Sequence, residues 1–425
     1  MKTVIMAGGK GTRISSVASD IPKPMIKIDG RPVLEREIEC LKNQGFKDII
    51  ITVSHLGSII MDYFGDGSKF GVNIKYFNEV EPLGNAGALF RIKDELTEDF
   101  LLLNADAIFD IDFNRFVEYH KKKGGLVTLF THPNSHPYDS GLIITDSNDS
   151  VLKWLSKEDD RPTNYKNLVN AGLHVISPKI LEQEINTPKI DLDRQLLKPL
   201  AGTGLMYSYK SSEYVKDMGT PDRYLAVTKD FKEGKVTSKN LCNKQKAIFL
   251  DRDGTINKSV GFLTNINDFE LEEGAAEAIK KINNSGYLAI VITNQPVIAR
   301  GEVTLEELDE IHNKMERLLG EQGAYLDAIY YCPHHPDKGF AGERIEYKII
   351  CDCRKPKPGM ILKASKDYNI DLEQSYMIGD YKNDVLCGKN AGCKTAIIDK
   401  DLKNDYDANI VGKSLLDCVN QIFGE

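Results

Sequence analysis

Runs of apolar residues alternate with amphipathic stretches along this chain, and the alternation occurs twice. In the first half, runs rich in Ile, Val and Leu are followed by stretches of helical periodicity such as residues 33–45. These runs are residues 3–9, 48–54, 72–78 and 100–106. Short apolar runs that alternate with helical patterns predict a parallel sheet covered by helices. Strand-like pieces then dominate from about residue 126 to 215, and they predict an antiparallel annex over that sheet.

A polar, charged stretch without periodicity, residues 232–245, follows the first pattern. Stretches of this kind are typical of linkers. The alternation then restarts, with apolar runs at residues 247–251, 287–294, 328–332, 375–380 and 394–399. We therefore predict an α/β protein of two domains, residues 1–231 and 246–425, joined by a linker at 232–245.

Composition narrows the class of protein. The 425 residues are 41% hydrophobic and 28% charged, which is typical of a soluble globular protein. A net charge of −8 argues against a general nucleic-acid binder, but it is compatible with small phosphorylated substrates. No apolar run approaches the roughly 18 residues of a membrane span, and the first apolar stretch is too short for a signal peptide. We expect a cytoplasmic protein with no nucleic-acid or membrane partner, and the sequence leaves open whether it forms a homo-oligomer.

A glycine-rich loop, AGGKGTR at residues 7–13, follows the first predicted strand. Its spacing fits neither the Walker A motif nor GxGxxG. Gly8, Gly9 and Gly11 nevertheless let backbone N–H groups approach an anion, and Arg13 adds a cation. The loop therefore predicts phosphate binding, and a tight turn between a strand and a helix is the alternative.

Further residues suit a nucleotide. Lys23 stands between two prolines, residues 82–89 form a second loop of small residues, and Asp106 ends an apolar strand. Asp217 lies far along the chain. A lone strand-end Asp is usually a cap, but two beside a phosphate loop can hold Mg²⁺ on a nucleotide.

Together the segments GGKGTR, PKPM, PLGNAGAL, NAD, VNAGLHV and DMGTP resemble the nucleotidyltransferases that make NDP-sugars from sugar 1-phosphates. The resemblance covers about residues 1–230 and implies a Rossmann-like, GT-A-like mixed sheet. It implies that in-line attack of a sugar phosphate on the α-phosphorus releases pyrophosphate. Asn85 replaces a common Thr, which leaves base selection open, and Ser156 and Glu158 flank Lys157 where the family often has Glu and Pro.

The resemblance also implies roles for individual residues. The nucleoside triphosphate would be bound by Gly8, Gly9, Gly11, Arg13, Lys23, Gly84 and Asn85, with Lys23 stabilising charge at the α-phosphate. Mg²⁺ would be held by Asp106 and Asp217. The sugar phosphate would be bound by Lys157, Asn170 and Gly172.

A second carboxylate pair, Asp251 and Asp253, follows the strand at 247–250. An EF-hand would need Gly and Glu where Ile256 and Phe262 stand, so a calcium loop is excluded. Two carboxylates at this spacing can act as nucleophile and as general acid and base. Short polar side chains and charges that suit a phosphoryl site occur later, at Thr293, Asn294, Lys355 and Asp380.

This set resembles the haloacid dehalogenase-type phosphatases over residues 247–425 and implies a HAD-like Rossmannoid parallel sheet. In that family Asp251 would form an aspartyl-phosphate, and Asp253 would protonate the leaving oxygen and activate water. Mg²⁺ would be held by Asp251, the Asp253 backbone carbonyl and Asp380. The phosphoryl group would be held by Thr293, Asn294 and Lys355. A degenerate, non-catalytic domain is the alternative.

Three of the eight cysteines, Cys332, Cys351 and Cys353, lie within 22 residues beside a choice of two histidines, His334 and His335. In a reducing compartment such a cluster favours a metal over disulfides, and it suits a structural Zn²⁺ site. Buried free cysteines are the alternative.

The cluster and its flanking motifs, CPHH, CxCRKPKPGM and TNQPVIARGE, resemble the zinc-containing heptose 1,7-bisphosphate phosphatases, whose zinc loop histidinol-phosphatases share. The family pattern selects His334 as the zinc ligand and matches Arg300 and Arg354 to substrate-phosphate contacts. Tyr381 departs from the Lys common in these enzymes, and the loop at 335–350 is long.

The two resemblances share an intermediate, heptose 1-phosphate. Residues 191–200 resemble the heptose 1-phosphate guanylyltransferase subgroup, so the expected activity is bifunctional. The phosphatase would remove the 7-phosphate of D-glycero-D-manno-heptose 1,7-bisphosphate. The resemblance pairs the α anomer with GTP, so the transferase would form GDP-D-glycero-α-D-manno-heptose for a surface glycan. Another sugar phosphate or NTP is one alternative, and a first domain that only senses NDP-sugar is the other.

Overall fold

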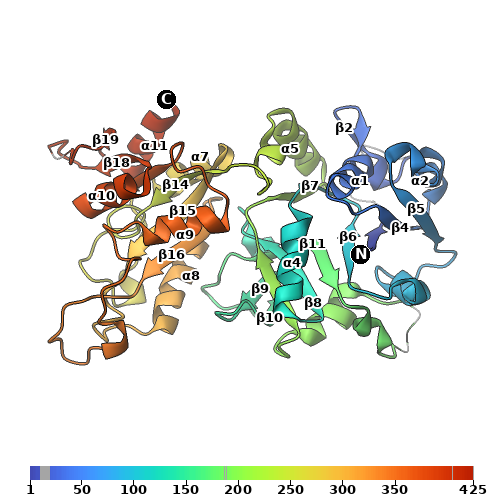
Figure 1. Ribbon diagram of the computed structural model, residues 1–425, viewed down its shortest axis with the longest axis horizontal. Helices are drawn as coiled ribbons and strands as arrows, with labels where there is room; N and C mark the ends of the chain where they lie inside the picture. The colour runs from blue at the N-terminus through green and yellow to red at the C-terminus, as the bar shows by residue number, and fades with distance from the viewer. Residues whose placement is uncertain (10–19, 186, 188, 404, 425) are drawn as a thin grey trace. The chain divides into compact units, whose positions relative to one another are not determined.

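The computed structural model describes residues 1–9, 20–185, 187, 189–403 and 405–424, and these form two compact units (Figure 1). Unit 1 contains Met1–His132, Ile143–Ser156 and Asn170–Cys242, and unit 2 contains Pro133–Leu142, Lys157–Val169 and Asn243–Glu425. The predicted linker at 232–245 contains a short helix, α6 (Lys235–Ser238), whose Val236 is buried. The domain limits at 231 and 246 stay a prediction.

Unit 1 is built on a nine-stranded sheet. Its strands are β1 (Thr3–Met6), β4 (Asp48–Val53), β5 (Asn73–Asn78), β6 (Phe100–Asn104), β8 (Val127–His132), β9 (Leu142–Thr145), β10 (Val151–Leu155), β11 (Val169–Ile176) and β12 (Met206–Lys210). β1 pairs in parallel with β4 and β6, whereas β11 pairs antiparallel with β6, so the sheet is mixed. The predicted antiparallel annex is wrong, because these later strands extend the same sheet and β12 pairs in parallel with β8.

Among the described residues of unit 1, two small sheets and six α-helices accompany the large sheet. The small sheets pair β2 (Lys27–Ile28) with β3 (Arg31–Pro32) and β7 (Ala107–Asp110) with β13 (Tyr214–Asp217). The helices are α1 (Val33–Asn43), α2 (Gly57–Phe64), α3 (Gly87–Arg91), α4 (Phe113–Lys123), α5 (Pro221–Lys232) and α6. α1 begins after Pro32, and its Leu34, Ile38 and Leu41 recur at helical spacing and are buried against the sheet.

Unit 2 is built on a six-stranded sheet whose neighbouring strands pair in parallel. Its order is β16 (Ala328–Cys332), β15 (Tyr287–Asn294), β14 (Lys246–Leu250), β17 (Tyr376–Gly379), β18 (Lys394–Ile398) and β19 (Ile410–Gly412). The chain runs outward from β14 in both directions, which makes β14 and its neighbours the switch point where such sheets bind ligands. The predicted α/β class with two sheets is confirmed.

In the described part of unit 2, five α-helices accompany the sheet: α7 (Ala275–Asn284), α8 (Leu305–Glu321), α9 (Gly359–Asp367), α10 (Lys382–Ala391) and α11 (Leu415–Phe423). α8 begins in a capping box, in which Thr304 accepts from the Glu307 N–H and Glu307 accepts from the Thr304 N–H. The core of this unit contains buried Ile248, Val291 and Ile378 from the three central strands.

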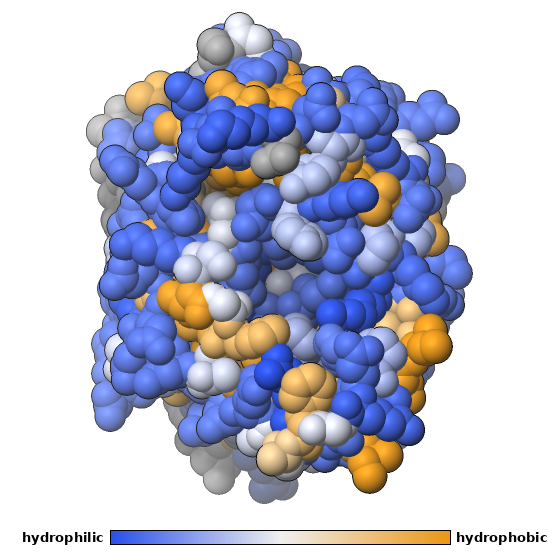
Figure 2. All heavy atoms as spheres, turned by 90° about the vertical axis from the view of Figure 1, so that its left-hand side faces the viewer, coloured by the Kyte–Doolittle hydropathy of each residue, from blue (hydrophilic) through white to orange (hydrophobic). Residues whose placement is uncertain are grey.

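None of the helices described is long and apolar enough to cross a membrane. Figure 2 shows one face of the molecule, which is mostly hydrophilic and carries its hydrophobic residues in small separate groups.

Candidate functional site

A cavity of about 850 Å³ lies at the carboxyl ends of β1, β4 and β6 in unit 1. Gly8 and Gly9 follow β1, Ser54 follows β4, and Asp106 follows β6. The Ser54 hydroxyl donates to the Gly8 carbonyl over 2.7 Å and so fixes the first turn of the glycine loop. Gly11 and Arg13, predicted to bind the triphosphate, lie outside the described residues.

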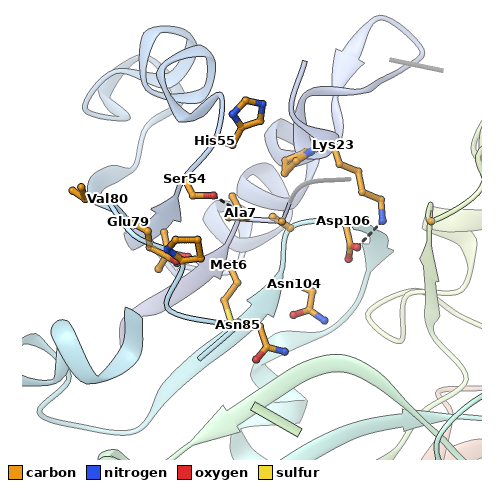
Figure 3. A pocket seen from close by; sticks show the side chains of 18 residues that line it. Met6, Ala7, Lys23, Ser54, His55, Glu79, Val80, Asn85, Asn104 and Asp106 are labelled. Atoms are coloured by element: carbon orange, nitrogen blue, oxygen red, sulfur yellow. Dashed lines mark hydrogen bonds and ion pairs between the residues drawn. The ribbon is translucent and has the colours of Figure 1, made fainter. Parts of the chain in front are cut away.

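One end of this cavity carries a cation and a carboxylate (Figure 3). Lys23 Nζ donates to Asp106 Oδ2 over 2.6 Å, and the Lys23 side chain is only 10% exposed. Lys23 begins a short 3-10 turn after Pro22, which has no N–H and a fixed φ, so the lysine has a stiff backbone. At this end of the cavity, Lys23 suits a phosphate group and the Asp106 carboxylate suits a cation.

The opposite end of the cavity carries a different carboxylate, Glu79, beside the exposed Val80 (Figure 3). Glu79 is half-buried, and burial raises the pKa of its carboxyl group, while a hydrogen bond from the Leu83 N–H opposes that rise. Glu79 was not predicted as a site residue from the sequence, although it directly follows β5. In its ionised form the Glu79 carboxylate offers hydrogen-bond acceptors only.

The loop at 82–87 is fixed by a segment more than a hundred residues away. Gly84 has φ +81°, and a Cβ there would lie 2.3 Å from the Ile190 carbonyl oxygen. The Ala86 N–H donates to that same oxygen over 3.0 Å, and Asn85 Oδ1 accepts from the Leu192 N–H over 2.7 Å. Asn85 therefore holds this loop to the start of a π-helical turn, Leu192–Leu197.

Asp217, the second predicted Mg²⁺ ligand of unit 1, lies near the Lys23 end. Its carboxylate accepts from the Gly219 N–H and from Arg223 Nη1, each over 2.7 Å. Burial would raise the pKa of Asp217, but these two partners and the Lys23 charge outweigh it and lower the pKa. Gly219 itself lines the cavity, which places Asp217 next to it.

The three predicted sugar-binding residues differ in their setting. Asn170 Oδ1 accepts from the Gly172 N–H over 3.3 Å, and Gly172 has φ +76° with no room for a Cβ beside Asn104. Asn104 lines the cavity, so this turn lies next to it. Lys157 is exposed in a turn after β10.

A second pocket, of about 190 Å³, lies at the carboxyl ends of β14 and β15 in unit 2 and contains Asp251, Asp253, Thr293, Asn294 and Lys355. Lys355 Nζ lies 2.6 Å from Asp251 Oδ1 and 2.6 Å from Asp384 Oδ1. Burial alone would lower the pKa of Lys355, but the two ion pairs outweigh it and raise the pKa. Burial raises the pKa of Asp251 to about 7, with Lys355 opposing and Asp384 adding to the rise.

The Asp253 carboxylate points into a buried polar network. It accepts from Arg252 over 2.8 Å, from Gln295 Nε2 over 2.9 Å and from Asn257 Nδ2 over 3.0 Å. Burial would raise the pKa of Asp253, but Arg252 and the hydrogen bonds outweigh it and lower the pKa. These hydrogen bonds engage both oxygens of the Asp253 carboxylate. The Asp253 atom that the resemblance assigns to Mg²⁺ is instead the backbone carbonyl oxygen.

Three carboxylates, Asp251, Asp380 and Asp384, have oxygen atoms within 4.8 Å of one another. Carboxylate oxygens are the ligands that Mg²⁺ prefers. Burial, followed by the Asp251 charge, raises the pKa of Asp380 to about 6. Asp380 was predicted from the sequence, whereas Asp384, the third residue of α10, had no predicted role.

Asn294, predicted to hold the phosphoryl group, also holds Lys355. Its Oδ1 accepts from the Lys355 N–H over 3.0 Å, and its Nδ2 donates to the Lys355 carbonyl over 3.1 Å. Thr293 Oγ1 accepts from Gln295 Nε2 over 2.8 Å.

The cluster predicted to hold zinc is assembled in space. Cys332, His334, Cys351 and Cys353 have ligand atoms within 4.8 Å of one another, and Cys353 Sγ lies 3.1 Å from Cys332 Sγ and 3.3 Å from His334 Nδ1. Three thiols and one imidazole are a donor set that fits tetrahedral Zn²⁺. Arg354 Nη1 donates to the His334 carbonyl, and Arg354 also lines the pocket of about 190 Å³. Arg300 does not line that pocket in the described structure.

Comparisons with known proteins match both halves of the chain. The family model described as nucleotidyl transferase matches residues 2–234, and the HAD-hydrolase-like model matches residues 352–415. The D-glycero-beta-D-manno-heptose-1,7-bisphosphate 7-phosphatase of Haemophilus ducreyi is 43% identical over 181 residues, which are 41% of this chain and 97% of that protein. The enzyme of the same name from Pasteurella multocida is 42% identical over 186 residues, 42% of this chain and 98% of that protein.

Among solved structures, the crystal structure of HddC from Yersinia pseudotuberculosis is 27% identical, with a TM-score of 0.48. That match covers 54% of this chain and 99% of the other.

Proposed function

The chain belongs to the nucleotidyl transferase family through residues 2–234 and to the family of the heptose bisphosphate 7-phosphatases through its HAD-like part, and from this premise we propose that it makes a nucleotide-activated heptose. It is a bifunctional enzyme with a nucleotidyltransferase and a phosphatase domain. The phosphatase would remove the 7-phosphate of D-glycero-D-manno-heptose 1,7-bisphosphate. The transferase would then join heptose 1-phosphate to GMP from GTP and release pyrophosphate. The observation that carries this proposal is that the chain spans nearly the whole length of phosphatases that act on the bisphosphate, fused to a nucleotidyltransferase that needs a sugar 1-phosphate.

In the phosphatase, Asp251 is the proposed nucleophile. One of its oxygens attacks the phosphorus of the 7-phosphate, the bond to the sugar oxygen breaks, and Asp253 gives its proton to that oxygen. Asp253 then takes a proton from the water that attacks the aspartyl-phosphate, which restores both carboxyl groups. The resting contacts of Asp253 favour its ionised form, and the charge of an incoming phosphate opposes them by raising its pKa.

In the transferase, catalysis would come from positioning and charge. Lys23, held beside Asp106 at one end of the cavity, is placed to stabilise charge that develops on the α-phosphate as the sugar phosphate oxygen attacks in line. No covalent intermediate with the chain is needed.

Metal ions fit the donor sets of the chain. Asp106 and Asp217 would hold Mg²⁺ in the transferase, and Asp251 and Asp380 with the Asp253 carbonyl would hold it in the phosphatase. When bound there, Mg²⁺ supplies neutralisation of phosphate charge. The four Cys and His residues would hold a structural Zn²⁺.

The proposed preference for guanine is supported by Glu79. Guanine alone among the common bases offers two adjacent donors, N1–H and the N2 amino group, on its pairing edge, and an ionised carboxylate can accept from both. Uracil, cytosine and adenine each present an acceptor beside their donor, which a carboxylate would repel. Glu79 lies opposite the Lys23 end of the cavity, where the base of a nucleotide with its phosphates at Lys23 would reach (Figure 3).

The test is incubation of the protein with Mg²⁺, the heptose bisphosphate and one NTP at a time. The names of the relatives specify the β anomer, whereas pairing with GTP predicts the α anomer, so both anomers are compared. Phosphate release in each tube, with pyrophosphate only with GTP, supports the proposal. Phosphate without pyrophosphate would leave the first domain a sensor of NDP-sugar. We place the enzyme in the cytoplasm, where NTPs are available.

A further inference from the structure

Arg300 of unit 2 lies between two aromatic rings. Its Cζ atom is 4.2 Å from the centre of the Phe262 ring and 4.5 Å from the centre of the Phe340 ring. Both distances are within the range in which a cation is attracted to an aromatic face. Arg300 Nε also lies 3.0 Å from Glu302 Oε1, an ion pair whose geometry falls short of a hydrogen bond. The side chain is 20% exposed, so this guanidinium is largely enclosed.

One ring of this stack belongs to the wall of the phosphatase pocket. Phe262 lines the same pocket as Asp251 and Lys355, between Gly261 and Leu263. Phe262 is 51% exposed, so about half of the residue's surface is covered by contacts within the protein. Arg300 supplies one of them.

The other ring belongs to the long loop between His334 and Cys351, and that loop is braced internally. Glu343 Oε2 accepts from the N–H groups of Gly339, over 2.9 Å, and Phe340, over 3.1 Å. Lys348, which is buried, donates from Nζ to the Asp337 carbonyl over 2.8 Å and lies 4.4 Å from the centre of the Phe340 ring. Phe340 therefore has a defined position within the loop.

The same loop is docked on the turn that carries Arg300. The Arg344 N–H donates to the Ala299 carbonyl over 3.0 Å. Gly301 has φ +75°, and a Cβ there would lie 1.9 Å from the Gly342 carbonyl, so only glycine permits this approach. Backbone contacts thus bring Phe340 to Arg300, and Arg300 in turn contacts Phe262.

We propose that Phe340 is a positioning residue for the phosphatase substrate: through Arg300 it fixes the Phe262 ring on the pocket wall, against which the sugar part of the substrate packs. The transferred phosphoryl group lies at Asp251 and Lys355 and needs no contact with this wall. The stack therefore governs binding of a phosphorylated sugar and leaves phosphoryl transfer itself unchanged. This inference rests on the proposed phosphatase function. It also gives the long loop between His334 and Cys351 a role, which is to bring Phe340 to Arg300.

The test compares F340A and F340Y with wild type on the heptose bisphosphate and on acetyl phosphate, whose acyl group is too short to reach the wall. For F340A we expect the KM for the bisphosphate to rise about ten-fold while kcat stays within two-fold. F340Y keeps the ring and stays within two-fold in both parameters. Acetyl phosphate turnover is unchanged in both variants. F423A, which removes a half-buried ring packed against Tyr287 in the same unit, is the matched control and leaves the KM unchanged.

A double variant, F340A with R300M, separates the stack from general damage. If Phe340 acts through Arg300, the double variant should bind the bisphosphate no worse than R300M alone. An unchanged KM in F340A, or equal losses on the bisphosphate and on acetyl phosphate, would overturn the inference. If wild type hydrolyses acetyl phosphate but not the bisphosphate, the proposed function fails by itself, and the same KM comparison on the best sugar phosphate of a panel still decides the role of Phe340.

Discussion

At the scale of single residues, chemistry in both units depends on carboxylates whose neighbours set their charge. Asp251 and Asp253 are two positions apart, yet burial raises the pKa of Asp251 while Arg252 and its partners lower that of Asp253. Gln295, which follows β15, contributes to the lowering at Asp253, whereas Lys355 opposes the rise at Asp251. The two shifts run opposite to the proposed roles, because a nucleophile must be ionised and a general acid must be protonated. A bound Mg²⁺ would lower the pKa of Asp251 and a bound phosphate would raise that of Asp253, so each charge would shift the carboxyl group toward its role.

Base choice is tested at Glu79. For E79Q we expect kcat/KM with GTP to fall about ten- to hundred-fold, because a hydrogen bond to a charged group contributes roughly 1.5–3 kcal/mol. Turnover with UTP should be equal or higher, since the amide no longer repels a base acceptor. The measurement is pyrophosphate release with each NTP.

E81Q is the matched control for that experiment. Glu81 is exposed two residues further on and does not line the cavity, so its removal should leave the preference for GTP intact. A preference that is equal in E79Q and wild type would contradict the role of Glu79.

Glu213 predicts a pH dependence of stability. This carboxylate is buried, accepts from the N–H groups of Asp112 and Leu241 and from the Ser211 hydroxyl, and burial raises its pKa to about 7. Because the folded state holds the proton more tightly than the unfolded state, this residue costs stability as the pH rises from about 4.5 to 7. The loss should be roughly 2–3 kcal/mol.

E213Q removes that titration and keeps the shape of the side chain. Urea unfolding should show the difference in stability between E213Q and wild type moving in favour of E213Q by this amount between pH 5 and pH 8. A difference that does not change with pH would show that Glu213 is not held protonated in the fold.

At the scale of elements, the sequence predicted well the strands that form the centre of each sheet. β1, β4, β6, β14 and β15 are continuous apolar runs because helices cover both faces of the sheet around them. β7, β13 and β19 were missed, since three or four residues are too few to show a period. The annex was misjudged because β11 pairs with β6, 70 residues away, and so joins the later strands to the same sheet, and no local pattern records that pairing.

In the candidate sites, too, local features were predicted from the sequence and long-range contacts were not. Gly8, Lys23 and Asp106 follow predicted strands or turns and do line one cavity. The contact of Gly84 with Ile190 joins residues more than a hundred positions apart, so the sequence could not show it.

That contact carries a prediction about the nucleotide loop. In G84A the new Cβ would lie 2.3 Å from the Ile190 carbonyl, so the loop must move, and we expect the KM for GTP to rise at least ten-fold. Phosphatase activity should be unchanged. G204A is the control, because Gly204 also has a positive φ, +76°, but no neighbour within 4 Å of the added Cβ. Equal effects of the two substitutions on GTP would mean that backbone strain alone matters.

The cysteine cluster makes a prediction about metal content. Wild type should carry one zinc per chain by elemental analysis, and C353S should lose most of it, since one of four ligands is gone. The variant should also unfold at a lower temperature, because a structural metal contributes to folding free energy. C242S alters an exposed cysteine outside the cluster and should keep its zinc. A wild-type protein without zinc, or a C353S variant that retains it, would contradict the site.

At the scale of the whole molecule, two sheets on one chain each place a candidate site for a phosphate group at the carboxyl ends of parallel strands. The product of one proposed reaction is the substrate of the other, so the two activities should depend on separate residues and yet act in order. D251N should abolish phosphate release from the bisphosphate, and D106N should abolish pyrophosphate release while phosphate release continues.

The most direct measurement is therefore a single incubation of heptose 1,7-bisphosphate, GTP and Mg²⁺ with wild type, D251N and D106N, followed by mass analysis of the products. We expect GDP-heptose only with wild type, heptose 1-phosphate with D106N and unchanged bisphosphate with D251N. Mixing the two variants should restore GDP-heptose. Release of phosphate by wild type without any nucleotide sugar, in the presence of each NTP in turn, would contradict the account.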